Sequence, residues 1–593
     1  MTLQANGNGR MRVLFLHPED APVRGVWLRE HWDLIVDLAF AGASTYADWA
    51  QQLKTRVLSI HSFVRETESY RWVNQLFERG RGRLLDEDGL DWWEILAMES
   101  YQDLHSLFLL QQLRGEFSRD QVELAATRPH KLARMAEQMF RAPVRYLAHG
   151  EANVFERLRR TLRSVRNLRA AQVAEIAFDK WDPNYQLRRR WTRNIRGGLS
   201  DPTVLLPSAY SNVTRSALAY AALLPDRKFL LVTTRRNAVP QHMPANVRLR
   251  SLAACAPPEE STQKESAELK EQWGNLLRKM TSESDDMAYA ASAGVWEYIP
   301  AHLQHGVHLR ETWKNVLDAE PIIGVLCGDD LNYHTRLPLM LARRRGLNAV
   351  YCSHGALDGG FLFKAPTADS YLVKGEMEKD YLERTGAVGP DQIVLGAPGP
   401  KQFADRSGQA RDAVVFFSQP YEVEGGRVES FYRDVIPPLC EGARRARRKV
   451  IVKLHPFESK RARQSLLDSV LPPEMRTEVQ VFDGSTPEKV MARAWCGITV
   501  DSSVAVECAL RGIPFFLCGW LDNAGMGYLQ QFSKFGVARV LESPDDIAQI
   551  PEMVAGFRLD LTTLERLWHA ANSTQLEQIM FGNRSVRLHS CCC

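Results

Sequence analysis

A histidine-proline pair follows a predicted strand in the C-terminal half of the chain. The motif Lys453-Leu454-His455-Pro456 comes directly after the apolar, β-branched run 449–452, which is typical of a buried strand. Pro456 has no N–H for a sheet ladder, so the strand should end there and direct His455 to the carboxyl edge of the sheet. Open α/β sheets bind ligands at that edge.

A serine pair follows a second predicted strand in the same half of the chain. Asp501-Ser502-Ser503 lies between the strand 497–500 and a predicted helix from about Val504 to Leu510. Serine and aspartate are frequent N-caps, and the first N–H groups of a helix bind phosphate. A histidine and a phosphate cradle on one edge favour cleavage of a nucleotide-linked bond, with His455 protonating or hydrogen-bonding the departing phosphate. A plain turn and a plain helix cap explain the same residues when each motif is taken alone.

Together the two motifs resemble those of bacterial sialyltransferases, Kdo transferases and CDP-glycerol-type polymer transferases, over roughly residues 320–520. The resemblance implies the GT-B architecture, an α/β fold in which two Rossmann-like domains face a cleft. It also implies that the histidine acts on the nucleotide phosphate and that Ser502 and Ser503 bind it. A CMP-sugar is the favoured co-substrate by resemblance, and a UDP-sugar remains open. No metal is implied, because protein donors can neutralise the leaving phosphate.

Two acidic motifs are candidates for the base that deprotonates an acceptor hydroxyl. Asp330 follows the apolar run 320–327, so the strand-edge argument places the pair Asp329-Asp330 in the cleft. The same residues could instead cap the helix that follows. Asp88, in Glu87-Asp88-Gly89, resembles the catalytic acidic pair of sialyltransferases and is the second choice. An acidic turn that caps the helix beginning near Asp91 explains it equally well.

A second histidine motif, His354-Gly355, follows the predicted strand 348–352. Glycine permits positive φ or a close approach of the backbone to a ligand. The pair resembles the other histidine motif of the CDP-glycerol polymer transferases, which implies His354 as an alternative base. Ser353 stands where that family usually has Gln or Trp, so the subfamily is left open.

Further residues are candidates for holding the nucleotide. Glu507 lies one helical turn after Ser503 and would bind ribose hydroxyls, although an ion pair with Arg511 is equally plausible. By resemblance to nucleotide-dependent GT-B enzymes, the loop at Asp483 would touch the base. The remaining candidates follow strand ends or belong to the motifs above: Ser418, Gln419, Lys453, Asp501 and Gly355.

The composition predicts a globular protein with two or three hydrophobic cores, since 45% of 593 residues are apolar. A net charge of +4 is too small to indicate nucleic-acid binding. We expect no membrane-spanning helix and no secretory signal, because no long apolar run is present. Scattered cysteines fit free thiols in a reducing cytoplasm. The terminal Cys591-Cys592-Cys593 is expected to be a loose end.

The predicted domain organisation has four parts. Residues 1–90 and 200–398 would form an N-terminal Rossmann-like acceptor domain, interrupted by a helical insertion over 91–199. Residues 399–540 would form the C-terminal nucleotide-binding domain, and 541–593 helices with a loose tail. The insertion is rich in arginine between Arg157 and Arg196, at helical spacing. That basic face could meet anionic lipid at the inner face of the membrane, or be simply solvated.

The sequence therefore predicts an inverting, metal-independent glycosyltransferase that acts on a surface or capsular polysaccharide. One enzymatic alternative is polyol-phosphate transfer from a CDP-alcohol, and another is epimerisation of a sugar nucleotide. The non-catalytic alternative is a nucleotide-binding subunit of a polysaccharide assembly complex.

Overall fold

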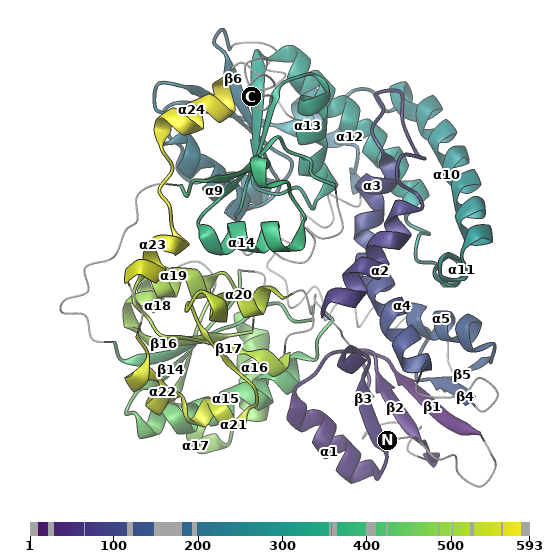
Figure 1. Ribbon diagram of the computed structural model, residues 1–593, viewed down its shortest axis with the longest axis vertical. Coiled ribbons are helices and arrows are strands. Elements are labelled where there is room, and N and C mark those ends of the chain that lie inside the picture. The colour runs from purple at the N-terminus through teal and green to yellow at the C-terminus, as the bar shows by residue number, and fades with distance from the viewer. Residues whose placement is uncertain are drawn as a thin grey trace.

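The computed structural model describes most of the chain, in fifteen stretches. They are residues 10–21, 29–63, 66–115, 122–147, 181–191, 199–354, 357, 365–398, 411–422, 425–456, 458–483, 487–500, 502–521, 527–558 and 561–582. Three parallel sheets with surrounding helices make up this part of the chain (Figure 1). Parallel strands are buried on both faces, which is why they appear in the sequence as short continuous apolar runs.

The N-terminal sheet has the strand order β3-β2-β1-β4-β5. Its helices are α1 (Ala43–Leu53), α2 (Glu66–Glu78), α4 (Tyr101–Arg114) and α5 (Lys131–Phe140). Its strands are β1 (Met11–Leu16), β2 (Leu34–Asp37), β3 (Arg56–Ser59), β4 (Val122–Ala126) and β5 (Val144–Tyr146).

The middle sheet has the order β12-β11-β10-β9-β6-β7-β8. Helices α9 (Ser211–Ala221), α13 (Tyr333–Arg344) and α14 (Glu376–Thr385) connect its strands. The strands are β6 (Thr203–Ser208), β7 (Lys228–Thr233), β8 (Val247–Ser251), β9 (Ile322–Cys327), β10 (Asn348–Cys352), β11 (Ser370–Val373) and β12 (Ile393–Leu395).

The C-terminal sheet has the order β15-β14-β13-β16-β17-β18. Among its helices are α15 (Val428–Arg445), α16 (Lys460–Val470), α18 (Pro487–Arg493), α19 (Val504–Leu510) and α20 (Tyr528–Lys534). The strands are β13 (Ala413–Phe417), β14 (Lys449–Lys453), β15 (Val479–Phe482), β16 (Ala494–Thr499), β17 (Phe515–Cys518) and β18 (Arg539–Leu541).

All three sheets share one topology, since the first five strands of each lie in the order 3-2-1-4-5. This is the Rossmann-like order, in which ligands bind at the carboxyl edge between strands 1 and 4. The predicted α/β class is therefore confirmed. The predicted division of the chain differs, because residues 1–90 and 200–398 do not share a sheet.

The expected helical insertion over residues 91–199 contains two strands that complete the N-terminal sheet, β4 and β5. The sequence of β4 is Val-Glu-Leu-Ala-Ala, and alanine is depleted in strands. The three-residue β5 is too short for a periodic pattern. Both strands are therefore weak signals in the sequence, although β4 pairs with β1 along its whole length.

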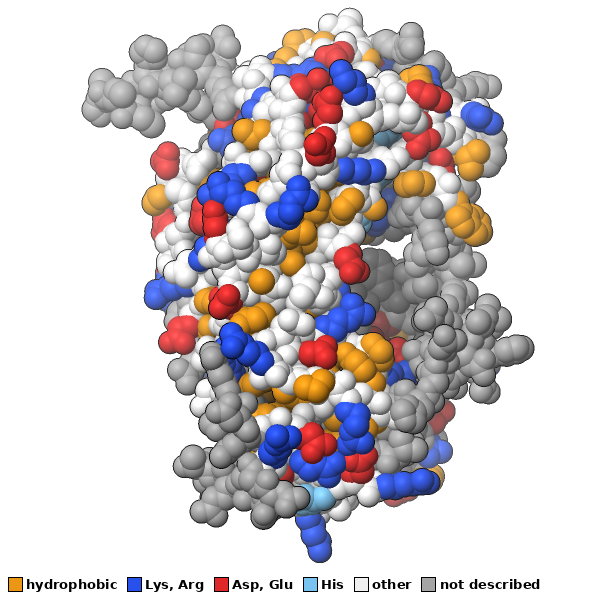
Figure 2. Space-filling model, turned by 90° about the vertical axis from the view of Figure 1, so that its right-hand side faces the viewer, with side chains coloured by type: hydrophobic (Ala, Val, Ile, Leu, Met, Phe, Trp, Pro, Cys, Tyr) orange, Lys and Arg blue, Asp and Glu red, His pale blue; other side chains and the backbone are white. Residues whose placement is uncertain are grey.

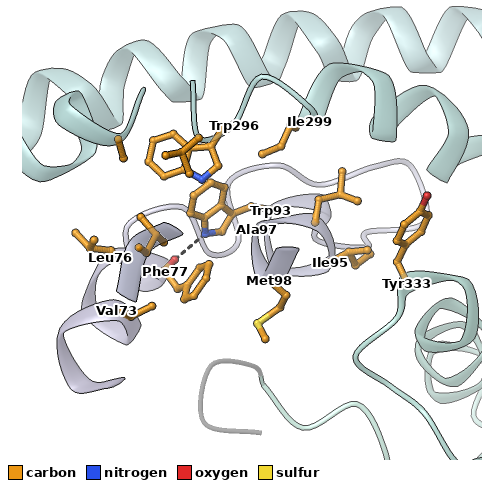
Figure 3. Packing of buried hydrophobic residues seen from close by; sticks show 14 of the residues in the cluster. Val73, Leu76, Phe77, Trp93, Ile95, Ala97, Met98, Trp296, Ile299 and Tyr333 are labelled. Atoms are coloured by element: carbon orange, nitrogen blue, oxygen red, sulfur yellow. Dashed lines mark hydrogen bonds between the residues drawn. The ribbon is translucent and has the colours of Figure 1, made fainter. Parts of the chain in front are cut away.

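A helical layer joins the N-terminal domain to the middle domain (Figure 1). It includes α3 (Trp92–Leu96), α10 (Gln263–Glu283), α11 (Asp285–Ser292) and α12 (Ile299–Ala319). At its centre the buried Trp93 donates a hydrogen bond from Nε1 to the Phe77 carbonyl oxygen at 2.7 Å and packs against Trp296 (Figure 3). One hydrophobic cluster runs from β1 through this layer to β9, so the two domains share a core.

The contact between the N-terminal and C-terminal domains is more polar. Arg427 donates to both carboxylate oxygens of Asp37, at 2.7 and 3.0 Å, and to the carbonyl oxygens of His17 and Pro18. The Asp37 side chain is fully buried. At the start of α1, the Ser44 hydroxyl donates to Asp434 of α15.

The last described helix returns to the middle domain. Helices α21 (Asp545–Ala548) and α22 (Ile550–Gly556) lie on the C-terminal domain, and α23 (Leu561–Leu567) contacts both α19 of the same domain and α14 of the middle domain. Helix α24 (Ser573–Phe581) packs against β9 and β10 (Figure 1). Ala397 donates to the carbonyl oxygen of His569 at 2.6 Å, and Ala571 donates back to Ala397 at 2.9 Å. The segments around Ala397 and 569–571 therefore run side by side where the chain passes between the two domains.

Basic and acidic side chains are interspersed on the face that carries α10 and α11 (Figure 2).

Most of the arginine-rich segment between Arg157 and Arg196 lies outside the described residues, as do Cys591–Cys593. None of the described helices combines the length and the apolar content needed to cross a membrane.

Candidate functional site

The C-terminal sheet carries three of the predicted motifs on one edge. Strands β14, β13 and β16 are neighbours, and they end next to His455, Ser418-Gln419 and Ser502-Ser503 respectively. Because the strands are parallel, all three loops leave the same carboxyl edge. His455 and the serine pair thus follow strands that flank β13, about 10 Å apart at the usual strand spacing.

A buried polar network holds the loop of His455. The backbone N–H of His455 donates to Glu458 at 2.6 Å, and Glu458 also accepts from Ser418 at 2.8 Å and from Arg463 at 2.7 Å. Burial, reinforced by the nearby Lys453 ammonium, lowers the pKa of His455 to about 4. The imidazole is therefore neutral at pH 7 and is suited to donating a hydrogen bond.

A cavity of about 520 Å³ lies between the middle and C-terminal domains. The C-terminal domain contributes residues of α19 that lie three or four positions apart and therefore share one face of the helix. The middle domain contributes α9 and the ends of β10 and β11. The lining residues used below are Arg215, His354, Lys374, Glu378, Ser503, Glu507 and Arg511. The predicted His354, Ser503 and Glu507 thus meet in one cavity, whereas His455 does not line it.

His354 follows β10 and is held by the neighbouring strand. Its Nδ1 contacts the carbonyl oxygen of Gly328, which follows β9. A carbonyl oxygen only accepts, so Nδ1 donates this hydrogen bond, and in the neutral imidazole the lone pair is then on Nε2. This tautomer leaves Nε2 able to accept a proton from a hydroxyl group.

Several charged residues of the cavity are already paired. Lys374 lies 3.5 Å from Glu378, and Glu378 accepts a 2.7 Å hydrogen bond from the Lys374 backbone N–H. Arg511 forms a two-pronged ion pair with Glu488 at 2.9 and 3.0 Å. The expected alternative partner of Arg511, Glu507, makes no hydrogen bond or ion pair with another described residue.

The two acidic base candidates lie outside this cavity. Asp330 is 1% exposed and accepts a 2.7 Å hydrogen bond from the Thr367 hydroxyl. Asp329 caps the following turn, and burial raises its pKa. Asp88 faces α12, where it pairs with Lys314 at 2.9 Å and Arg310 at 3.2 Å.

The other candidates for holding the nucleotide are dispersed. Lys453 is buried, and its Nζ donates to the carbonyl oxygen of Leu454 at 2.9 Å. Gln419 accepts from Thr499 at 3.4 Å, and Asp483 is exposed. Asp501 and Gly355 lie outside the described residues. Of this group, none lines the described part of the cavity.

Sequence analysis missed Arg215, Lys374 and Glu378 in the cavity. Lys374 directly follows β11, so the strand-edge argument that singled out His354 applies to it as well. Arg215 lies within α9, and no local motif distinguishes it from a solvated helix residue.

Comparison with solved structures finds similar chains of low sequence identity. The calicheamicin glycosyltransferase CalG4 is 12% identical, with a TM-score of 0.37 over 66% of this chain and 98% of its own. The UDP-GlcNAc 2-epimerase of Methanocaldococcus jannaschii is 12% identical, with a TM-score of 0.39 over 66% and 99%. MurG of Acinetobacter baumannii is 11% identical, with a TM-score of 0.36 over 64% and 99%. No protein-family model matches the chain, and no curated protein matches it.

Proposed function

We propose that this protein is a glycosyltransferase that moves a sugar from a nucleotide-sugar to a hydroxyl group of a glycan. The observation that carries the proposal is the shared cavity, where His354 of one Rossmann-like domain meets Ser503 and Glu507 of another. A proton acceptor, a hydroxyl donor and a carboxylate are the groups that this reaction needs. In the proposal the middle domain binds the acceptor and residues 413–541 bind the nucleotide.

Ser503 and Glu507 are proposed to hold the nucleotide. The Ser503 hydroxyl has no hydrogen-bond partner among the described residues, so it is free to donate to a phosphate oxygen. Glu507, one turn further along the same face of α19, would accept hydrogen bonds from the ribose hydroxyls. His455 and Lys453 lie at the end of β14, which is separated from the Ser503 side of the sheet by β13. In the proposal they would approach the leaving phosphate from that side.

His354 is proposed as the base in preference to Asp330 and Asp88. Its Nε2 would take the proton of the acceptor hydroxyl while that oxygen attacks the anomeric carbon. The bond from this carbon to the phosphate oxygen breaks, and the nucleotide leaves with the electron pair. Attack from the side opposite the leaving group inverts the anomeric centre, and the donor set described here requires no metal ion for this step.

Transfer of a polyol phosphate from a CDP-alcohol is a second candidate. The placement of His354 in the cavity and of Asp330 outside it favours this candidate, because a histidine base is what the resemblance implies for that reaction. There the hydroxyl would attack phosphorus, and CMP would leave.

The decisive experiment offers the purified protein CMP-, CDP-, UDP- and GDP-linked donors and measures which nucleotide is released. We expect release from a sugar donor, with His354→Ala lowering kcat by about 10²–10⁴ and Asp330→Asn leaving it within a few-fold. Release of CMP from CDP-glycerol alone would favour the second candidate. Nucleotide binding without turnover across the panel would contradict both and favour a non-catalytic assembly subunit.

The finer parts of the proposal rest on the sequence alone. They are a CMP-linked donor, a surface or capsular polysaccharide as acceptor, and peripheral contact with the membrane through the Arg157–Arg196 segment. Sedimentation with anionic vesicles, compared with neutral vesicles, tests the membrane contact, which should weaken as salt is raised.

A further inference from the structure

Not every charged side chain that lines the cavity is paired within the protein. Lys374 is paired with Glu378, and Arg511 is paired with Glu488. Arg215 and Glu507 make no hydrogen bond or ion pair with another described residue, although the Glu507 charge contributes to raising the pKa of Arg511. They belong to different domains, α9 of the middle domain and α19 of the C-terminal domain.

Arg215 lies on the face of α9 that borders the cavity. Ser216 and Ala219 line the cavity with it, and residues four apart share one side of a helix. Small neighbours leave the guanidinium room to reach into the space between the domains. Arg215 is exposed where it borders the cavity, so a ligand that fills the space would remove water from its charge. Covering a cation without supplying a counter-charge is unfavourable.

A ligand that occupies this cavity should therefore bring an anion to Arg215. The guanidinium fork matches the paired oxygens of a phosphate or carboxylate, and such charge-assisted hydrogen bonds are the strong ones. Ser503 and Glu507, in the proposed function, hold the first phosphate and the ribose from the wall of the other domain. The anion at Arg215 is then a different group of the same ligand.

We infer that Arg215 binds a second oxyanion of the donor, which is either the β-phosphate of a nucleoside diphosphate or the carboxylate of an acidic sugar. This inference rests on the proposed function and narrows its substrate class. A neutral sugar linked to a nucleoside monophosphate would leave Arg215 without a counter-charge and is excluded as the preferred donor.

Calorimetric titration with UMP, UDP and a CMP-linked carboxyl sugar tests the inference. UMP and UDP differ by one phosphate, so their comparison isolates the second oxyanion. The variants are Arg215→Gln and the charge-retaining Arg215→Lys. The matched control is Arg461→Gln, which removes an exposed helical arginine that does not line the cavity.

We expect Arg215→Gln to raise the Kd of one diagnostic ligand about tenfold or more and to leave UMP within twofold. An effect on UDP identifies the β-phosphate, and an effect on the CMP-linked carboxyl sugar alone identifies the carboxylate. Arg215→Lys should recover part of the affinity, and Arg461→Gln should change nothing.

Two outcomes would overturn the inference while the proposed function stands. One is that all three ligands bind the Arg215→Gln variant as they bind the wild type, although Ser503→Ala and Glu507→Gln weaken UMP. The other is an equal loss for UMP and UDP, which would assign Arg215 to the first phosphate. Failure of the wild type to bind any of the three ligands, together with no nucleotide release from any donor of the panel, would instead overturn the proposed function itself.

Discussion

The N-terminal and C-terminal domains have the same strand order but use their carboxyl edges differently. In the N-terminal domain, Asp37 at the end of β2 is buried against Arg427, and the start of α1 meets Asp434. In the C-terminal domain, Ser503 and Glu507 at the corresponding edge border an open cavity. One edge is closed by protein groups, whereas the other borders open space.

This difference shows that a Rossmann-like topology alone does not identify a ligand site. The N-terminal edge has the polar groups of such a site, but the neighbouring domain supplies their partners. At Gly42 there is no space for a side chain, because a Cβ atom would collide with the Asp434 carboxylate. This packing leaves no space for a ligand between Gly42 and Asp434, and the N-terminal domain connects the C-terminal domain to the helical layer that it shares with the middle domain.

The largest expected effect comes from breaking the polar interface. Replacing Arg427 with Met leaves the fully buried Asp37 carboxylate without its counter-charge. Removing one partner of a buried ion pair costs roughly 3–5 kcal/mol. We expect the free energy of unfolding in urea to fall by about that amount, or a separate early transition for the N-terminal domain to appear.

A double variant distinguishes the ion pair from general damage. Asp37→Asn combined with Arg427→Met removes both charges, so it should be less destabilised than the sum of the two single variants. UMP affinity should stay within twofold of the wild type in the folded variants. Additive losses, or a loss of nucleotide binding equal to that of Ser503→Ala, would contradict the assignment of this edge as an interface.

A smaller effect is expected from replacing the serines at the starts of α19 and α1, which should change nucleotide affinity and stability respectively. Ser503 precedes α19 in the cavity, and Ser44 lies at the start of α1 in the interface. We expect Ser503→Ala to raise the Kd for UMP about tenfold with little change in stability, since one hydrogen bond to a charged group is lost. Ser44→Ala should lower stability by about 1 kcal/mol and leave UMP affinity unchanged. The reverse pattern would exchange the roles of the two edges.

The sequence predicted the positions of candidate site residues correctly at strand ends where a short local motif follows an apolar strand. His354 and Ser503 follow apolar runs that are unambiguous strands, so the strand-edge argument placed both correctly at sheet edges. It did not identify the ion pair between Arg427 and Asp37, which are 390 positions apart. Pairing over such a separation depends on how the domains dock, and no local periodicity encodes that.

The same limit explains why the observed domain division differs from the predicted one and why the acidic base candidates lie outside the cavity. Strands β4 and β5 are short and atypical in composition, so they were hidden among helices. Asp330 does follow β9, as expected, but its side chain turns to Thr367 and not to the cavity. The direction of a side chain at a strand end depends on its packing partners, which are distant in the sequence. The position of the strand end depends on the local run of apolar residues.

The last expected effect is a pH dependence of the free energy of unfolding, to which one histidine on each edge contributes. Burial is the main cause that lowers the pKa of His130 and of His455 to about 4 each. In the unfolded chain both would titrate near 6.5. The unfolded state therefore binds more protons between pH 6.5 and 4, and the free energy of unfolding should fall as the pH drops through that window, by about 1–2 kcal/mol per histidine at pH 5.

Nucleotide binding should change the pKa of His455 but not that of His130. The Nδ1 atom of His130 accepts a hydrogen bond from the Leu132 N–H and caps α5, so its contribution should persist whether or not nucleotide is present. A bound phosphate on the edge of His455 would favour the imidazolium and raise its pKa. UDP should therefore stabilise the protein more at pH 5 than at pH 8, and His455→Gln should abolish that excess while His130→Gln retains it. If UDP stabilises the protein equally at both pH values, the phosphate does not reach the edge at β14 and His455 has no part in binding it.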